Sequence, residues 1–205
     1  MENNQFDFHL DQLIKERLVM KQNGIYQLTS IGKEYANRMD TDQVVISKQA
    51  KISAWICVMR EKSGETDFLI YTRLKQPFYG CQGFISGKLK YGEKIIAAAK
   101  RELLEETGLT GNPELVNIKH FLVYDKKTNE LIEDKFMYLC RVINPKGIIK
   151  SNEEGEHMWV NEAEMRLKIT HPFEDIEELI KYAMEAKKFD GTIKLFEIDH
   201  WSEKF

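Results

Sequence analysis

Residues 87–109 of the 205-residue chain read GKLKYGEKIIAAAKRELLEETGL, and this stretch decides the fold. A helix is predicted from Glu93 to about Thr107, because small and apolar residues recur at helical spacing and a glycine follows where many helices end. The face of this helix that is apolar in the first turns becomes acidic in the last. Steps of seven residues from Ile95, Ala98 and Ala99 lead to Glu102, Glu105 and Glu106.

This acidic cluster predicts a bound cation. Glu102 and Glu106 are i,i+4 neighbours of like charge, which costs an isolated helix roughly 0.2–0.5 kcal/mol. They also lie at the helix end where the dipole disfavours negative charge. Arg101 is placed to pair with Glu105 and orient it, as part of the catalytic site. Oxygen ligands without Cys or His favour Mg²⁺ or Mn²⁺ over zinc, although spacing alone also allows a solvated, charged helix end.

The whole stretch resembles the Nudix box. That pattern is Gly, five residues, Glu, seven residues, then Arg-Glu-aliphatic-x-Glu-Glu-x-Gly-aliphatic, and every defining position matches, from Gly87 through Glu93 and Arg101 to Gly108. The resemblance covers roughly Lys48–Lys188 and implies an α+β fold, an α/β/α sandwich with a mixed sheet. It also implies a metal-dependent pyrophosphohydrolase, which splits the diphosphate bond of a nucleoside diphosphate linked to another group.

The resemblance also implies roles for individual residues of the box. In the family, the carboxylates matching Glu102, Glu105 and Glu106 bind divalent ions, so all three are expected metal ligands and the last two are expected to be catalytic. The position of Gly87 lets the backbone join the coordination, and Glu93 supports the loop. Which nucleotide derivative is the substrate stays open, because selectivity comes from loops rather than from the box.

The resemblance also implies that a general base or an extra metal ligand comes from an acidic residue outside the box. Glu153, Glu154 and Glu156 lie in a candidate loop before Trp159, and Glu154 is favoured narrowly over the other two. Each of these acids is more often a solvated loop residue than a catalytic group. His157 beside them is a second candidate proton carrier, with a packed or exposed histidine as the alternative.

Three further residues are candidates for contact with the substrate. Arg73 follows a predicted strand near the box, and its fork of donors suits a phosphate group. Phe78 and Tyr79 lie in the loop that leads to the box and are candidates for stacking on a base, with core packing as the alternative.

The remaining residues of this region predict a sheet with helices packed on it. Inside the first strand, Ile52, Ala54, Ile56 and Val58 alternate with Ser53, Trp55 and Cys57. The predicted elements are strands at 52–60, 68–71, 116–124, 135–142, 158–160 and 192–196, and helices at 162–168 and 173–188.

Residues 1–47 are predicted to form a separate segment, ahead of a Nudix domain at 48–205. Residues 24–35 resemble the wing and final helix of a truncated winged helix, and Thr29 or Ser30 is expected to cap that helix. Six basic against seven acidic residues through Lys48 make nucleic-acid binding unlikely. An earlier helix is expected to carry Leu10, Leu13, Ile14, Leu18 and Val19, and the later one to turn Tyr35 and Met39 inward.

Composition excludes several other classes of protein. Apolar residues make up 42% and charged residues 31%, with a net charge of −3, as in a globular protein without a strong basic field. Apolar runs such as Ile52–Met59 are too short to span a bilayer. Three widely spaced cysteines are expected to be reduced thiols in the cytoplasm.

A homodimer is a further expectation. A nucleotide-sensing transcriptional regulator is the alternative function, and an isomerase of the same superfamily a weaker one.

Overall fold

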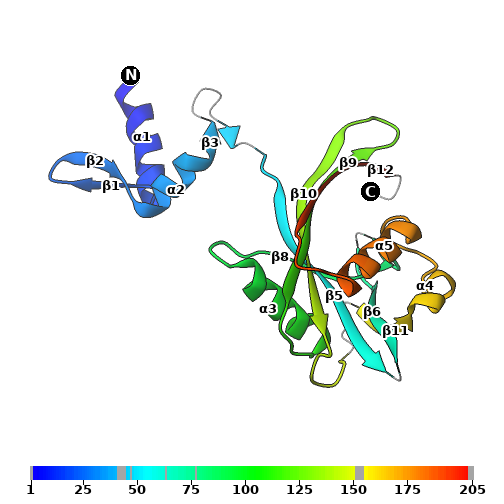
Figure 1. Cartoon of the computed structure of the whole chain (residues 1–205). Coiled ribbons are helices and arrows are strands. Elements are labelled where there is room, and N and C mark those ends of the chain that lie inside the picture. The colour runs from blue at the N-terminus through cyan, green and yellow to red at the C-terminus, as the bar shows by residue number, and fades with distance from the viewer. Residues whose placement is uncertain are drawn as a thin grey trace. The chain divides into compact units, whose positions relative to one another are not determined.

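The chain forms two compact units in the computed structural model, Met1–Gln49 and Ala50–Phe205. We call them the N-terminal and C-terminal units, and each is described by itself. Figure 1 labels most of their helices and strands. No described helix has both the length and the apolar character needed to cross a membrane. The structure describes residues 2–40, 45–46, 48–62, 64–76, 78–150 and 155–202.

The N-terminal unit contains a helix, a hairpin, a second helix and a short strand pair. The hairpin turns through Asn23 and Gly24, whose φ angles of 52° and 80° suit the right-handed twist of its strands. Thr29 caps the second helix, as predicted, because its Oγ1 accepts a hydrogen bond from Gly32 N at 3.0 Å. The elements are α1 (Glu2–Lys15), β1 (Val19–Gln22), β2 (Ile25–Leu28), α2 (Ser30–Arg38), β3 (Met39–Asp40) and β4 (Val45–Ile46).

Two predictions for this unit are wrong. The first helix ends at Lys15, so Leu18 and Val19 lie beyond it, because Arg17 takes a φ of 57° that no α-helix accepts. Tyr35 does not point into a core but is 42% exposed, and Met39 belongs to β3 rather than to the helix.

A mixed sheet forms the centre of the C-terminal unit. Its main order is β11-β6-β5-β10-β9-β12; β10 pairs in parallel with β5, and β12 with β9, while the other neighbours are antiparallel. Two short strands, β7 and β8, add to β6 and β5. The strands are β5 (Lys51–Lys62), β6 (Glu65–Arg73), β7 (Gln82–Gly83), β8 (Ile85–Lys88), β9 (Glu114–Asp125), β10 (Leu131–Ile143), β11 (Gly155–Asn161) and β12 (Lys194–Ser202).

Helices cover both faces of this sheet, which makes the predicted α/β/α sandwich. α3 (Ile95–Thr107) lies on one face, and α4 (Glu162–Lys168) and α5 (Ile176–Lys187) lie on the other (Figure 1). The alternation along β5 divides the core between the layers, as successive strand residues must. Residues Ala54, Ile56 and Val58 pack with the α3 layer, and Trp55, Cys57 and Met59 with the α5 layer.

Several element boundaries differ from the predictions. The strand predicted at 158–160 is β11, which starts at Gly155, and the strand predicted at 192–196 is β12, which runs on to Ser202. Ladder hydrogen bonds come from the backbone, so pairing extends through polar residues that the hydrophobic pattern leaves out. The last helix starts at Ile176 rather than 173, because Asp175 caps it by accepting from Glu177 N at 2.7 Å.

Candidate active site

A short loop and a glycine set where the acidic helix begins and ends. α3 starts at Ile95, two residues later than predicted, because the Glu93 carboxylate accepts a hydrogen bond from Lys90 N at 3.0 Å and stays in the loop. At the other end, Gly108 adopts a φ of 72°, and its N–H donates to the Leu104 carbonyl. This left-handed position favours glycine and leaves the acidic residues in the last two turns.

Arg101 connects the loop to the acidic end of α3. Its Nε and Nη2 each donate to one oxygen of Glu93 at 2.8 Å, and Nη2 also donates to the Lys88 carbonyl at 3.1 Å. Nη1 donates to Glu102 Oε1 at 2.5 Å and to Glu105 Oε2 at 2.9 Å. The hydrogen bonds from Arg101, and after them the bond from Lys90 N, lower the pKa of Glu93 to about 2. The bond to Glu93 is also the main reason that the pKa of Arg101 is raised.

The carboxylate of Glu102 lies against the backbone of Gly87. Glu102 is only 7% exposed, although it is charged, and it follows the buried Ala98 and Ala99 on the helix. A Cβ atom added at Gly87 would lie 1.8 Å from Glu102 Cδ and 2.1 Å from each carboxylate oxygen. Glycine at this position of β8 is therefore what leaves room for the carboxylate.

Glu105 and Glu106 share the last turn of α3 but differ in exposure. The Glu105 side chain is 53% exposed, whereas Glu106 is half-buried. Within the described ranges, no three His, Cys, Asp or Glu side chains converge closely enough to hold a metal ion. One guanidinium nitrogen of Arg101 contacts the carboxylates of both Glu102 and Glu105.

The chemistry of these side chains nevertheless fits a hard divalent cation. The cluster offers carboxylate oxygens, which Mg²⁺ and Mn²⁺ prefer. Two of the carboxylates already gather about a positive group, the Arg101 guanidinium, and Gly87 keeps the space beside Glu102 free of a side chain. A divalent ion would compete with Arg101 for the same oxygens.

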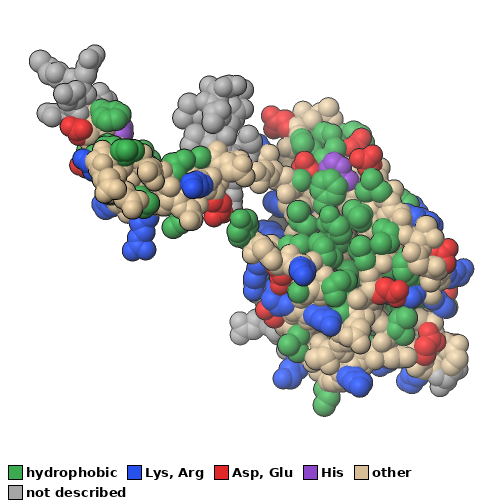
Figure 2. All heavy atoms as spheres, turned by 60° about the vertical axis from the view of Figure 1, so that its left-hand side comes forward, with side chains coloured by type: hydrophobic (Ala, Val, Ile, Leu, Met, Phe, Trp, Pro, Cys, Tyr) green, Lys and Arg blue, Asp and Glu red, His purple; other side chains and the backbone are tan. Residues whose placement is uncertain are grey.

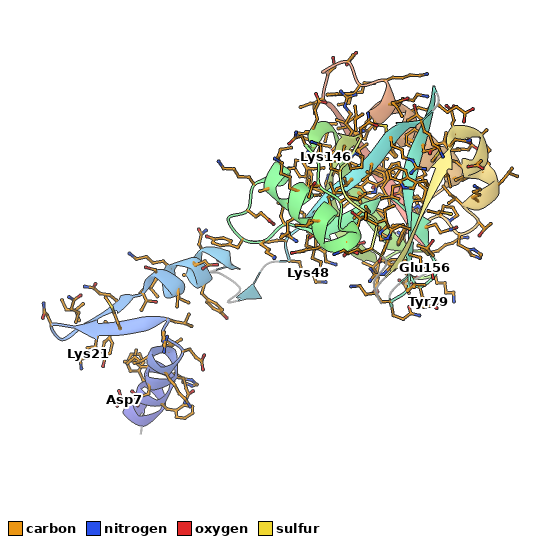
Figure 3. The ribbon with its side chains drawn as sticks, turned by 90° about the horizontal axis from the view of Figure 1, so that it is seen from below. Asp7, Lys21, Lys48, Tyr79, Lys146 and Glu156 are labelled. Carbon is orange, nitrogen blue, oxygen red and sulfur yellow. The ribbon has the colours of Figure 1, made fainter. Side chains whose placement is uncertain are left out.

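The predicted substrate residues lie at the end of β6 and in the loop that follows it. Arg73 is the last residue of β6, and its Nη2 donates to the Gln76 carbonyl at 3.3 Å. Phe78 adopts a φ of 68°, and its ring meets Phe173 edge-on at 6.0 Å. Tyr79 is 63% exposed and is labelled in Figure 3. The Phe78 ring therefore packs against another ring, whereas the Tyr79 ring is largely exposed to solvent.

Of the three acidic residues outside the box, the structure describes only Glu156. Glu153 and Glu154, the favoured candidate base, lie outside the described residues. Glu156 is exposed on β11 (Figure 3). His157 follows it, with its ring 5.5 Å from that of Tyr71, and burial lowers the pKa of the imidazole. Burial therefore favours the neutral form of this imidazole.

Two contacts near the site are not evident from the sequence. The bond from Arg101 to Glu102 joins adjacent residues, and helical spacing rules give no signal for such a pair. At Gly155, the first residue of β11, an added Cβ atom would lie 1.9 Å from Cε2 of Tyr71, so this position needs glycine. The sequence signal for the contact between Gly155 and Tyr71 is a glycine between two glutamates, and such a glycine is equally compatible with an ordinary turn.

The architecture defines the class to which the chain belongs. A mixed sheet lies between helical layers, and a glycine-anchored loop leads into a helix with an acidic end. A family model described as the NUDIX domain matches residues 50–183. The chain is a member of the Nudix family.

Solved structures with the same fold come from several organisms. The NUDIX domain of Shewanella oneidensis NrtR, complexed with ADP ribose, is 16% identical with a TM-score of 0.57, over 78% of this chain and 100% of that one. A MutT protein from Bacillus halodurans is 20% identical with a TM-score of 0.56, over 76% and 93%. A MutT protein from Methanosarcina mazei Go1 is 21% identical with a TM-score of 0.53, over 72% and 100%. At these identities the likeness concerns the fold.

Proposed function

We propose that the protein is a Mg²⁺- or Mn²⁺-dependent pyrophosphohydrolase that cleaves the diphosphate bond of a nucleoside diphosphate linked to another group. The observation that supports this best is the acidic end of α3, where Arg101 holds two carboxylates and Gly87 makes room for one of them. A fold does not need three neighbouring glutamates there, since their mutual repulsion is unfavourable without a cation.

The metal ligands in this proposal are Glu102, Glu105 and Glu106, with the backbone at Gly87. When bound, a hard divalent ion neutralises phosphate oxygens and lowers the pKa of a water molecule. If a divalent ion took the oxygens of Glu102 and Glu105 from Nη1 of Arg101, the fork between Arg101 and Glu93 would still keep the loop beside the helix. The fork uses Nε and Nη2 rather than Nη1.

The residues at the end of β6 are proposed to select and hold the substrate. Arg73 would bind a phosphate group, and Tyr79, together with Phe78, would offer an aromatic surface to a base. Glu154 is the proposed base that takes a proton from the attacking water. Water then attacks phosphorus, the bridging P–O bond breaks, and the products are a nucleoside monophosphate and a second phosphorylated compound.

A panel of nucleoside diphosphate derivatives tests this proposal. The protein is incubated with each compound, with and without Mg²⁺, and a phosphatase is added to release phosphate from monophosphate products. We expect metal-dependent turnover of at least one compound. The panel contains nucleoside diphosphate sugars, dinucleotides, dinucleotide cofactors and nucleoside triphosphates. If folded protein supplied with metal turned over none of them, the support for a hydrolase would be removed.

A matched pair of variants connects the activity to the helix. Glu105→Gln or Glu106→Gln is expected to lower turnover at least roughly a hundredfold, because each removes a proposed metal ligand. Glu162→Gln is the control, since this exposed glutamate lies on α4 in the other helical layer. Near-normal turnover in both box variants, with the control unchanged, would contradict the metal assignment.

A nucleotide-sensing regulator is the second candidate, and the observation that favours it is the separate N-terminal unit with its hairpin and following helix. The balanced charge of this segment speaks against contact with nucleic acid. A gel-shift assay at low salt separates the two functions, because sequence-selective DNA binding together with an inactive panel would favour the sensor.

The three cysteines are free and buried, which is the state expected in a reducing compartment, and we propose a cytoplasmic location. A homodimer stays a prediction.

A further inference from the structure

Gln82 is a buried polar residue next to the proposed substrate site. It is the first residue of β7 and lies opposite Thr72 of β6, the residue before Arg73. Only 9% of Gln82 is exposed, so its amide must find hydrogen-bond partners within the fold. These partners show which part of the chain Gln82 holds in place.

The carboxamide of Gln82 binds the backbone of a segment 88 residues further along the chain. Its Oε1 accepts hydrogen bonds from Thr170 N at 2.8 Å and from His171 N at 3.1 Å. Its Nε2 donates to Thr72 Oγ1 at 3.4 Å, which is longer than an ordinary N–H···O bond. The carbonyl oxygen of the side chain therefore makes the stronger contacts.

The backbone of Gln82 holds the same segment. Its N–H donates to the His171 carbonyl at 2.7 Å, and its carbonyl accepts from Phe173 N at 3.0 Å. A parallel β-bridge joins Gln82 to Pro172. Residues 170–173, which we call the anchored segment, thus lie along β7 in the connection between α4 and α5.

The anchored segment carries the ring that supports Phe78. The Phe173 ring lies against Gly83, where an added Cβ atom would come within 3.1 Å of Cδ2, and its centroid is 6.0 Å from that of Phe78. Phe78 has a φ of 68°, which a bulky residue rarely adopts without support from its surroundings. Cys81 N gives one such support by donating to the Phe78 carbonyl at 3.1 Å. The Phe173 ring gives a second, from a distant part of the chain.

The end of β6 is where placed contacts of this kind matter for a nucleotide. Figure 2 shows basic and acidic side chains interspersed over one face of the C-terminal unit, so attraction there depends on individual side chains. β6 ends at Arg73, and Glu156 of β11 lies opposite Thr72. Figure 3 labels Glu156 and Tyr79 at this end of the sheet.

We propose that Gln82 is a positioning residue for substrate binding. It holds the anchored segment, which places Phe173 against Phe78, and the Phe78 ring is in turn proposed to face the base of the nucleotide. This inference rests on the proposed function, from which the role of Phe78 is taken. Because the base lies apart from the diphosphate bond, a loss of this positioning should weaken binding and leave the chemical step unchanged.

Two substitutions at Gln82 separate its acceptor from its size. Gln82→Met keeps an unbranched side chain of similar length but lacks the carbonyl oxygen. We expect it to raise KM at least roughly tenfold, with kcat within about threefold. Gln82→Glu retains an oxygen for Thr170 N and His171 N, so its KM should stay within about threefold of that of the unchanged protein. Thr72→Val is the matched control, since it removes the long bond to Nε2 and should also leave KM within about threefold.

A double-mutant cycle tests whether Gln82 acts through Phe78. Phe78→Leu removes the ring that Phe173 contacts and should raise KM by itself. The variant that combines Gln82→Met with Phe78→Leu should have the KM of Phe78→Leu within about threefold, because the second change removes what Gln82 positions. A purely structural role of Gln82 would instead make the two effects multiply.

The dissociation constant of ADP, measured by calorimetry with Mg²⁺, keeps this inference separate from hydrolysis. If the unchanged protein binds ADP but turns over no panel compound, the proposed hydrolysis fails, while a dissociation constant raised by Gln82→Met alone still supports the positioning role. Should Gln82→Met not fold, Phe173→Leu takes its place, because it removes the contact with Phe78 and keeps the backbone bonds of Gln82.

Four results would overturn the inference. They are an affinity that Gln82→Met leaves unchanged, an equal loss of affinity in Gln82→Glu, effects that multiply in the double variant, and an unchanged protein that neither binds ADP nor turns over any compound. The last of these would remove the proposed function as well.

Discussion

At the scale of single residues, Arg101 organises the electrostatics of the acidic helix end. One guanidinium group contacts three glutamates and a backbone carbonyl, and these bonds join the loop to α3. The fork to Glu93 has planar, bidentate geometry, which a lysine cannot reproduce. The loop and the helix therefore depend on each other for their positions.

The pH dependence of the Glu93 contact can be predicted from its lowered pKa. A carboxyl whose pKa falls on folding stabilises the folded state above its ordinary pKa of 4.5, and this contribution is lost as the pH falls from there through about 2. Glu93→Gln should lower the melting temperature most near pH 7 and less near pH 3. Thermal unfolding of both proteins across this range measures the difference. A difference that grows toward low pH would contradict the assignment.

The contact between Gly87 and Glu102 predicts an unusual combination of effects for Gly87→Ala. The new Cβ atom would meet the carboxylate at 1.8 Å, so the flexible end of Glu102 must move while the backbone can stay. We expect a folded protein with turnover reduced at least roughly a hundredfold, because a displaced proposed ligand no longer stabilises the transition state. Circular dichroism and steady-state kinetics measure the two effects. An active variant would show that the Glu102 carboxylate need not stay beside residue 87.

At the scale of helices and strands, the sequence predicted the elements with strong periodicity. The alternation from Ile52 to Val58 predicted a strand, and the structure confirms it as part of β5, buried from Ser53 onward with Ile52 exposed. The seven-residue steps from Ala98 and Ala99 placed Glu105 and Glu106 at the end of one helix. Both patterns follow from backbone geometry, which a sequence records directly.

Element ends were harder to predict, because side-chain contacts across the fold decide them. α1 ends where Arg17 takes a positive φ, which no feature of the sequence indicated. α3 starts late because Arg101, eight residues further along, holds Glu93 in the loop. The bond of Arg101 to Glu102 was missed for a similar reason, since neighbours on a helix do not normally face each other.

A capping box sets the start of α4 and gives a prediction about stability. The Asn161 side chain accepts from Glu164 N at 2.9 Å, and Asn161 N donates to the Glu164 carboxylate at 3.3 Å. Asn161→Ala should lower the free energy of unfolding by ~1 kcal/mol, whereas Asn161→Asp should keep most of it because aspartate also caps. Urea titration measures both variants. Equal losses would show that the cap is not what stabilises this helix end.

At the scale of the whole C-terminal unit, a buried lysine ties the sheet to the helical layer opposite α3. Lys119 on β9 has no exposed surface and pairs with Glu174, which precedes α5. Its ammonium group also lies 4.3 Å from the ring centre of Phe121 and 5.0 Å from that of Tyr182. The charge is thus compensated within the core.

The two partners of this ion pair should respond unequally to substitution. Glu174→Gln leaves an ammonium group buried without its counter-charge and should lower the free energy of unfolding by ~3 kcal/mol. Lys119→Met leaves only the partly exposed Glu174 and should lower it by ~1 kcal/mol or less, because methionine fills much of the same space. Denaturant unfolding of both variants measures the two values. The reverse order would show that the aromatic rings suffice to hold the charge.

The parallel pairing of β12 with β9 has a consequence for the order in which the protein is made. Residues 114–125 leave the ribosome well before residues 194–202, yet the second segment covers the edge of the first. During this interval β9 presents an open edge, to which a neighbouring nascent chain can add. A chaperone that binds extended segments would find a target here, and slower translation of the intervening region would lengthen the period during which the edge is open.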